Sequence, residues 1–295
     1  MKPSPFDYAV ATSLEHAIAL VEAEEDAKFI AGGQSLIPLL TLRFANPALL
    51  VDLSQLDELR SVRRTDDTLT IGALARHVDI VRNTVISEAA PLLSAAADWV
   101  AHPQIRNRGT FGGTVAHSDS AAEFPAALLA SEATIVARSG AGERRIASTD
   151  FFGAHFQTAL RHGELVVAVE IPAAGTQTRW GFSEFARRKG DYAIGGAAVR
   201  ACVGDDGRCE SVGAGLISAG PGPTRAQGLD EQLVGRRVDE AAVATAAAEA
   251  VRSLEPDDNV HGTKEYRRAI VAESLRRALH EAFGTSGTDA RRGPA

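Results

Sequence analysis

The chain has 295 residues, of which 45% are hydrophobic and 23% are charged, as in ordinary globular proteins. Its formal net charge of −7 argues against nucleic acid or an anionic membrane surface as the main partner. No run approaches the roughly 18 apolar residues of a membrane span, and residues 1–5 lack the apolar core of a signal peptide. We therefore expect a cytoplasmic protein without a membrane span.

Hydrophobic periodicity predicts a compact first unit, in the order β-α-β-α-β, up to about residue 54. The first helix carries apolar residues at helical spacing and has Thr12 or Ser13 near its cap. The predicted elements are a strand at 6–10, a helix at 12–24, a strand and a Gly-Gly turn at 29–35, a helix to about 44, and a strand at 49–53.

A second part extends to about residue 175. A polar turn between two short runs predicts a hairpin over residues 61–72. The further predictions are helices at 74–82, 92–100 and 121–130, and strands at 133–137, 144–147 and 164–171. Residues 173–178 are small and polar, and they follow a strong strand, so we interpret them as a linker.

The remaining residues predict three strands followed by three helices. The strands are expected at 180–187, 194–203 and 209–218, and the helices around 224–234, 239–252 and 263–283. Cys202 and Cys209 flank a hairpin-turn sequence, which predicts two reduced thiols in a strand pair. Two thiols cannot ligate an iron–sulfur cluster that needs four. Residues 284–295 have no apolar face and are predicted to be disordered.

Residues 104–117 (QIRNRGTFGGTVAH) have the wrong composition for a core element. Three glycines fall close together, with Thr110 and Thr114 beside them. Glycine reaches positive φ without steric cost, and successive backbone N–H groups can form a nest for an anion. This stretch is either a cradle for a diphosphate or a glycine-rich turn between packed segments.

Another Gly-Gly turn lies earlier in the chain, in residues 29–36 (FIAGGQSL), and predicts a strand, a tight turn and a helix start with Ser35 as N-cap. We call this the first turn and the one in residues 104–117 the second turn. The N–H groups of a helix start favour anions. Two such turns, about 80 residues apart, suit a ligand with two phosphates and a long reach.

Four segments, residues 31–35, 104–113, 117–126 and 188–193, resemble the FAD-binding medium subunits of molybdenum hydroxylases, the family of the medium chain of aerobic carbon monoxide dehydrogenase and the FAD subunit of xanthine dehydrogenase. The resemblance covers about residues 3–283. It implies an α+β fold. A two-part FAD-binding domain of PCMH/VAO type would span 1–175, with sub-parts 1–54 and 55–175. A C-terminal domain of the CO dehydrogenase flavoprotein type, an antiparallel sheet with helices, would span 178–283.

The resemblance also implies a set of residues that bind FAD: Ala31, Gly32, Gly33, Gln34, Ser35, Thr110, Phe111, Gly112, Gly113, Thr114, Glu123, Leu165, Lys189, Asp191 and Tyr192. It places Glu123 on the FAD ribose, although Ser120 and Glu123 also form a capping-box sequence. Gln34 has no nucleophilic ring nitrogen, so FAD should be bound non-covalently.

Several of these residues have an alternative, structural interpretation. Phe111 could touch the cofactor or fill the core, and Leu165 could line the flavin pocket or simply lie in a buried strand. Lys189 and Asp191 belong to a charge run of the kind that is usually solvated. The resemblance implies that this run faces the flavin, with Tyr192 as a screen over the ring. No catalytic residue is expected on this chain.

Three further groups of residues bear on the expected ligand site. Arg106 and Arg108 could meet a phosphate, although pairing with acids is preferred. The eight histidines show no metal spacing, so no metal is expected. His117 lies near the second turn and could support it without touching a ligand.

The function that the resemblance implies is electron transfer inside a heterotrimer. A large molybdopterin subunit oxidises the substrate, a small subunit with [2Fe–2S] clusters relays the electrons, and FAD on this chain reduces an external acceptor. A dimer of heterotrimers is expected, with contact to the inner membrane only through the assembled complex. The alternatives are a self-sufficient flavin oxidase and a nucleotide-binding regulator. The sequence does not identify the substrate or the acceptor.

Overall fold

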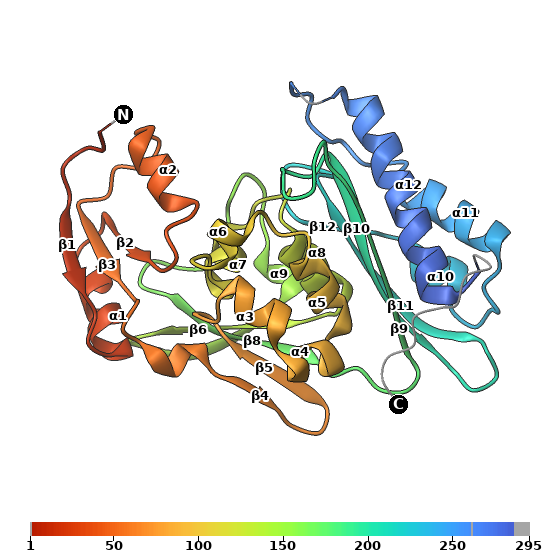
Figure 1. Cartoon of the computed structure of the whole chain (residues 1–295), viewed down its shortest axis with the longest axis horizontal. Coiled ribbons are helices and arrows are strands. Elements are labelled where there is room, and N and C mark those ends of the chain that lie inside the picture. Colours follow the sequence, from red (N-terminus) through yellow and green to blue (C-terminus); the bar gives the residue numbers. More distant parts are fainter. Residues whose placement is uncertain (1, 261, 286–295) are drawn as a thin grey trace.

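The computed structural model describes residues 2–260 and 262–285. Its N-terminal unit has the predicted β-α-β-α-β order (Figure 1). The strands form a parallel sheet in the order β1-β3-β2. The elements are β1 (Asp7–Val10), α1 (Leu14–Glu22), β2 (Ala27–Ile30), α2 (Leu36–Thr41) and β3 (Leu49–Asp52). Ser13 caps α1 as predicted, because its side chain accepts a hydrogen bond from the backbone N–H of His16.

The central part contains an antiparallel sheet of five strands in the order β4-β5-β8-β6-β7. The predicted hairpin over 61–72 is confirmed as β4 and β5. The strands are β4 (Val62–Arg64), β5 (Thr68–Gly72), β6 (Thr134–Ser139), β7 (Gly142–Ala147) and β8 (Leu165–Pro172). Seven α-helices and one 3-10 helix accompany the sheet: η1 (Asp57–Arg60), α3 (His77–Arg82), α4 (Thr84–Ala89), α5 (Pro91–Ala97), α6 (Pro103–Arg106), α7 (Phe111–His117), α8 (Glu123–Ala130) and α9 (Ser148–Phe151).

The C-terminal part is a four-stranded antiparallel sheet in the order β12-β11-β10-β9, with helices α10, α11 and α12 beside it (Figure 1). Its elements are β9 (Thr178–Phe185), β10 (Gly195–Val203), β11 (Cys209–Ile217), β12 (Thr224–Arg225), α10 (Leu229–Leu233), α11 (Glu240–Ala250) and α12 (Lys264–Phe283). The helix predicted around 224–234 is therefore shorter, because its first residues extend the sheet. Both cysteines are free, as predicted. Most of the tail predicted to be disordered, residues 286–295, lies outside the described residues.

The largest hydrophobic core joins the central part to the C-terminal sheet. Ala198 and Ile217 of that sheet are buried with residues of α5, α7 and α8 in one cluster. The other face of the C-terminal sheet packs against α11 and α12 in a second cluster. A third cluster lies under α1 and includes Leu165 and Val167 of β8. β8 thus connects the N-terminal unit to the central part.

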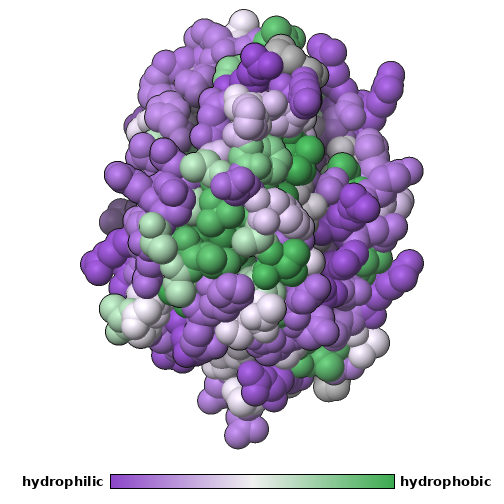
Figure 2. All heavy atoms as spheres, turned by 90° about the vertical axis from the view of Figure 1, so that its left-hand side faces the viewer, coloured by the Kyte–Doolittle hydropathy of each residue, from purple (hydrophilic) through white to green (hydrophobic). Residues whose placement is uncertain are grey.

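The N-terminal unit exposes apolar side chains on β1, on α2 and on the loop after α2. Residues 36–44 are almost all apolar, so one buried helix face cannot cover them. The exposed side chains are Tyr8, Val10, Ile37, Leu42 and Phe44, and Phe44 is 79% exposed. Figure 2, which views the molecule from this side, shows an apolar area on its surface. We call these five residues the apolar face. No helix within the described ranges has the length and hydropathy needed to cross a membrane.

Candidate functional site

The two glycine turns, far apart in the sequence, meet backbone to backbone. A Cβ atom on Gly32 would overlap the carbonyl oxygen of Arg108 and would lie 2.9 Å from Cα of Gly109. The contact exists only because residue 32 has no side chain. The hypothesis that both turns form one site therefore agrees with their positions in the fold.

The first turn is the open one, with its N–H groups free. Gly33 has φ +70°, the left-handed conformation expected of a glycine in this turn. In the described part of the chain, the backbone N–H groups of Gly32, Gly33, Gln34 and Ser35 have no backbone or side-chain acceptor. Successive free N–H groups at a helix start attract an anion. Ser35 begins α2 as predicted, but its side chain makes no capping bond.

The second turn is packed rather than open. Gly109, Gly112 and Gly113 do not adopt the positive φ that the sequence suggested, because residues 111–117 form the helix α7. The backbone N–H of Phe111 donates to Ala75 O and that of Gly112 donates to Ala73 O, each at 2.8 Å. A Cβ on Gly112 would lie 2.8 Å from Cα of Ala73. Glycine is needed here for close packing.

Gly113 differs from its two neighbours. Its N–H has no acceptor within the described residues, and a Cβ there would meet only the side chain of Thr110 within 4 Å. Residue 113 therefore borders open space and offers a free donor four residues after Gly109, which the first turn contacts. Phe111, by contrast, is fully buried against Phe124 at a centroid distance of 5.2 Å. Its side chain fills the core, so the structure contradicts the prediction that it touches the cofactor.

A histidine that sequence reasoning missed holds the second turn in place. The Nε2 atom of His77 lies 3.0 Å from the carbonyl oxygen of Thr110 and 3.0 Å from Oγ1 of Thr114. Because a carbonyl oxygen can only accept, Nε2 carries the proton and donates to it. Burial, and to a lesser degree the charge of Arg106, lowers the pKa of His77 to about 4. The ring is neutral and structural, and its Nδ1 atom has no partner among the described residues.

The predicted capping box at Ser120 and Glu123 does not form. Helix α8 begins at Glu123 itself, with Ala122 as N-cap and no side-chain capping bond. The carboxylate of Glu123 therefore does not bond back to a Ser120 cap, although it interacts with the backbone of its own residue at the helix start. Glu123 is buried, and burial, with a further contribution from the charge of Asp119, raises its pKa to about 7.

The second buried carboxyl group near Glu123 was not predicted. Glu184 lies on β9 and is 8% exposed. Burial and the charge of Glu123 raise its pKa to about 9. In the sequence this residue looks like a surface charge before the basic run at 187–189, so no local signal distinguished it.

The segment predicted to face the flavin packs against residues 99–102, which lie just before α6. Nζ of Lys189 lies 5.5 Å from the ring centroid of Trp99, and a Cβ on Gly190 would lie 2.6 Å from the ring of His102. Asp191 is exposed, and its N–H donates to Arg188 O in a turn.

Tyr192 is the aromatic residue of this segment, and its side chain is exposed. Desolvation and the charges of Asp119 and Glu123 raise the pKa of its phenol, although 75% of the residue's surface is exposed. The phenol therefore lies near these two carboxylates. A large exposed aromatic side chain near two carboxylates is suited to cover a planar ligand.

Other predicted residues serve the scaffold. The Gln34 amide donates to the carbonyl oxygen of Gly32 at 3.0 Å and so braces the first turn. Leu165 is buried in the core under α1. Arg106 donates to the carbonyl oxygens of residues 100 and 101, so the preferred pairing with acids is wrong. His117 stacks on Phe156 at 4.9 Å. Ala31 is half-buried at the end of β2.

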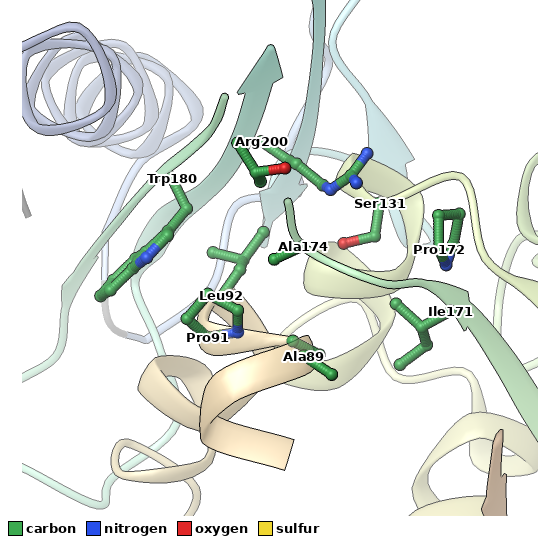
Figure 3. Close-up of a pocket in the computed structure, with 11 residues that line it drawn as sticks. Ala89, Pro91, Leu92, Ser131, Ile171, Pro172, Ala174, Trp180 and Arg200 are labelled. Atoms are coloured by element: carbon green, nitrogen blue, oxygen red, sulfur yellow. The ribbon is translucent and has the colours of Figure 1, made fainter. Parts of the chain in front are cut away.

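A small cavity lies at the junction of the central part and the C-terminal sheet (Figure 3). Trp180, Arg200 and Leu92 are among its lining residues. Its volume is about 10 Å³, which is room for a single water molecule, so it is not a cofactor site. Among the described residues, no group of three or more His, Cys, Asp or Glu side chains could hold a metal.

Two families match the chain. Residues 4–174 match the family described as FAD binding domain in molybdopterin dehydrogenase, and residues 180–282 match the CO dehydrogenase flavoprotein C-terminal domain. The chain is 44% identical to the 6-hydroxypseudooxynicotine dehydrogenase complex subunit alpha of Paenarthrobacter nicotinovorans, covering 97% of this chain and 98% of that one. It is 34% identical to the carbon monoxide dehydrogenase medium chain of Hydrogenophaga pseudoflava, covering 96% and 99%.

Solved structures agree over nearly the whole chain. Carbon monoxide dehydrogenase from Hydrogenophaga pseudoflava matches with a TM-score of 0.93 and 34% identity, covering 97% of this chain and 99% of that one. Quinoline 2-oxidoreductase from Pseudomonas putida 86 matches with a TM-score of 0.90 and 37% identity, covering 97% and 99%. The free N–H groups at the two joined turns fit the diphosphate of FAD. The chain belongs to the family of FAD-binding medium subunits of molybdenum hydroxylases.

Proposed function

We propose that this chain holds FAD non-covalently and passes electrons from [2Fe–2S] clusters on a partner subunit to an external acceptor. The observation that carries the proposal is the contact between Gly32 of the first turn and residues 108–109 of the second, together with the N–H groups of residues 32–35, which have no acceptor among the described residues. When bound, FAD supplies the redox chemistry. The residues of this chain bind it, orient it and screen it.

The diphosphate is held by the N–H groups of residues 32–35 and of Gly113. His77 keeps the second turn in register through Thr110 and Thr114. The carboxylate of Glu123 accepts hydrogen bonds from ribose hydroxyls, since it is not engaged by the predicted Ser120 capping box. The loop of Lys189 and Asp191 places Tyr192 over the flavin ring.

FAD is expected to come off the protein intact. Gln34, in the first turn, has an amide instead of a nucleophilic nitrogen, and that amide is used to brace the turn. Acid precipitation should therefore release all the flavin into the supernatant. Yellow colour that stays with the precipitated protein would show a covalent bond and refute this part of the proposal.

We propose that the partners are a large molybdopterin subunit and a small iron–sulfur subunit, in a dimer of heterotrimers. Relatives carry names such as medium chain of carbon monoxide dehydrogenase. The chain divides into residues 1–175 and 178–283, in agreement with the ranges of the two matching families. The substrate is oxidised on another chain, so no residue here acts as a base toward it.

The apolar face is the docking surface for the iron–sulfur subunit. Helix α2 begins directly after the first glycine turn, so a subunit that covers this face lies next to the cofactor. Phe44→Glu should keep the FAD content and abolish co-purification with the iron–sulfur subunit. Val260, 88% exposed and outside the apolar face, provides the control Val260→Glu, which should assemble normally.

The decisive test is to purify the chain alone and to measure its flavin content and its response to substrate. An electron-transfer subunit binds FAD in a one-to-one ratio and is not bleached by the substrate of the assembled enzyme. Bleaching by that substrate would indicate a self-sufficient oxidase. A protein that binds FAD but neither assembles with partner subunits nor transfers electrons would be a nucleotide-binding regulator.

A further inference from the structure

The second buried carboxyl group, Glu184, has no partner of its own. Within residues 2–260 and 262–285, neither of its oxygens takes part in a hydrogen bond, although both are shielded from solvent. An ionised carboxylate in such a place is costly, because burial removes its hydration and nothing replaces it. Either the group is neutral, or it shares a proton with another acid.

The packing of α8 on the C-terminal sheet determines which acid is near. A Cβ on Gly213 would lie 2.5 Å from the carbonyl oxygen of Ala130, and a Cβ on Gly215 would lie 2.6 Å from Cα of Ala126. Ala130, the last residue of α8, therefore lies against Gly213 of β11. Ala126, in the middle of α8, lies against Gly215. One turn further back along α8, Glu123 lies near the end of β11.

The pairing of the strands shows that Glu184 lies in line with the last residue of β11. Ile217, the last residue of β11, pairs with Gly196, and Gly196 pairs with Glu184 on β9. Residues that pair directly share a face of the sheet, so Glu184 and Ile217 point to the side on which α8 packs. Gly196 has no side chain to separate them. The two carboxyl groups, Glu123 and Glu184, thus approach each other across a glycine.

The groups around the pair are acidic or neutral. Asp119 precedes α8, and its charge raises the pKa of Glu123. The charges of Asp119 and Glu123 also raise the pKa of the Tyr192 phenol. From the opposite face of β9, Glu281 accepts the backbone N–H of Phe182. No cation forms an ion pair with Glu184 in the described part of the chain. Two buried acids without a counter-cation cannot both ionise, and Glu184, with its more strongly raised pKa, keeps the proton.

We propose that Glu184 is a positioning residue for the cofactor: as a neutral acid it donates a hydrogen bond to the Glu123 carboxylate and holds that group toward the FAD ribose. The inference rests on the proposed contact between Glu123 and the ribose. It gives the buried Glu184 a partner, and it leaves one carboxylate, rather than two that repel each other, to receive the ribose hydroxyls.

The test measures FAD affinity of the full chain by flavin fluorescence over a range of pH, for the wild type, Glu184→Gln and Glu184→Leu. The Gln amide donates a hydrogen bond at every pH, so its affinity should equal that of the wild type at neutral pH. The wild type should then lose affinity as the pH rises through the pKa of Glu184, while Glu184→Gln should not. Leu has a similar size but no donor, and it should weaken FAD binding about tenfold or more.

A merely structural role predicts the opposite for Glu184→Leu, because an apolar side chain in place of an unpaired buried acid is neutral or stabilising. Melting temperatures establish that each variant is folded. If Glu184→Leu does not fold, the pH profiles of the wild type and Glu184→Gln decide alone. Infrared spectroscopy adds an independent readout, since the carbonyl band of a protonated carboxyl group should be present in the wild type and absent from Glu184→Gln.

Glu123→Gln separates this inference from the proposal on which it rests. Unchanged FAD affinity in Glu123→Gln would refute the contact with the ribose. Weaker binding in Glu123→Gln together with wild-type binding in Glu184→Leu, or identical pH profiles for the wild type and Glu184→Gln, would overturn the role of Glu184 alone.

Discussion

The two glycine turns look alike in the sequence but use glycine for different physical reasons. At the first turn Gly33 supplies a left-handed backbone conformation and Gly32 permits contact with the second turn, and the N–H groups there remain free. At the second turn Gly112 allows close packing on Ala73, and its N–H is already bonded. A Gly-Gly pair thus marks either an open donor site or a tight contact. In the proposed function the first turn and Gly113 donate to the diphosphate, and the rest of the second turn supports them.

The largest effect on the two turns is expected from a methyl group added where they touch. In Gly32→Ala the new Cβ would overlap the Arg108 carbonyl oxygen, so the turns must move apart. We expect FAD affinity to fall at least tenfold and stability to drop by about 1–3 kcal/mol, as for other overpacked sites. Equilibrium dialysis and urea unfolding measure the two effects. Gly175→Ala, where the added Cβ meets nothing within 4 Å, should change neither; equal losses in both variants would contradict the contact.

Gly113→Val should separate binding from folding. The added Cβ would lie 2.6 Å from Oγ1 of Thr110, which has to move, and meets no other residue within 4 Å. The branched side chain is proposed to project into the cofactor site. We expect a folded chain, with a melting temperature near that of the wild type, that purifies without FAD. Absorbance at the flavin band relative to the protein band measures occupancy. Full flavin occupancy in this variant would show that Gly113 does not face the cofactor.

A change at His77 tests the second turn separately from the first, because this buried histidine supports only the second turn. His77 has a pKa of about 4 in the folded chain and about 6.5 when unfolded, so the unfolded state binds an extra proton between these values. Stability contributed by this residue is present above pH 6.5 and should decline by about 3 kcal/mol as the pH falls to 4. Urea unfolding at several pH values should show a shallower decline for His77→Gln than for the wild type. His162→Gln, at an exposed position, is the control and should follow the wild type.

The smallest effect is expected at Tyr192, which lies in neither turn. Tyr192→Ala should leave FAD affinity within about twofold, because the diphosphate donors are elsewhere. If the phenol covers the flavin ring, oxidation of the reduced flavin by oxygen or a dye should change several-fold in the assembled enzyme. Reduction by substrate at the partner subunit should stay the same. Stopped-flow measurements of the two half-reactions distinguish these outcomes; an altered reductive half with unaltered reoxidation would place Tyr192 away from the flavin.

Local patterns sufficed for much of the fold. The β-α-β-α-β unit, the Ser13 cap and the β4–β5 hairpin follow from periodicity, capping and turn chemistry within short windows. The glycine motifs and the resemblance gave the family, because the family's residues recur in order along the chain, and the FAD site that they indicate stays a proposal. The capping box at Ser120 failed for a tertiary reason: the carbonyl of Ser120 is bonded to the backbone N–H of Ser218, and α8 starts three residues later.

By itself, the sequence determined the family of this protein, its cofactor and the two turns that are proposed to hold it, since each depends on residues that are neighbours along the chain. Only the tertiary structure decided that the turns touch, that His77 supports the second turn, and that Glu184 approaches Glu123. The partners of His77 are 33 and 37 residues away, and Glu184 reaches α8 through the register of three strands. Burial reveals both residues, His77 with two partners on the second turn and Glu184 with none among the described residues, and burial is a property of the folded chain that no local pattern records.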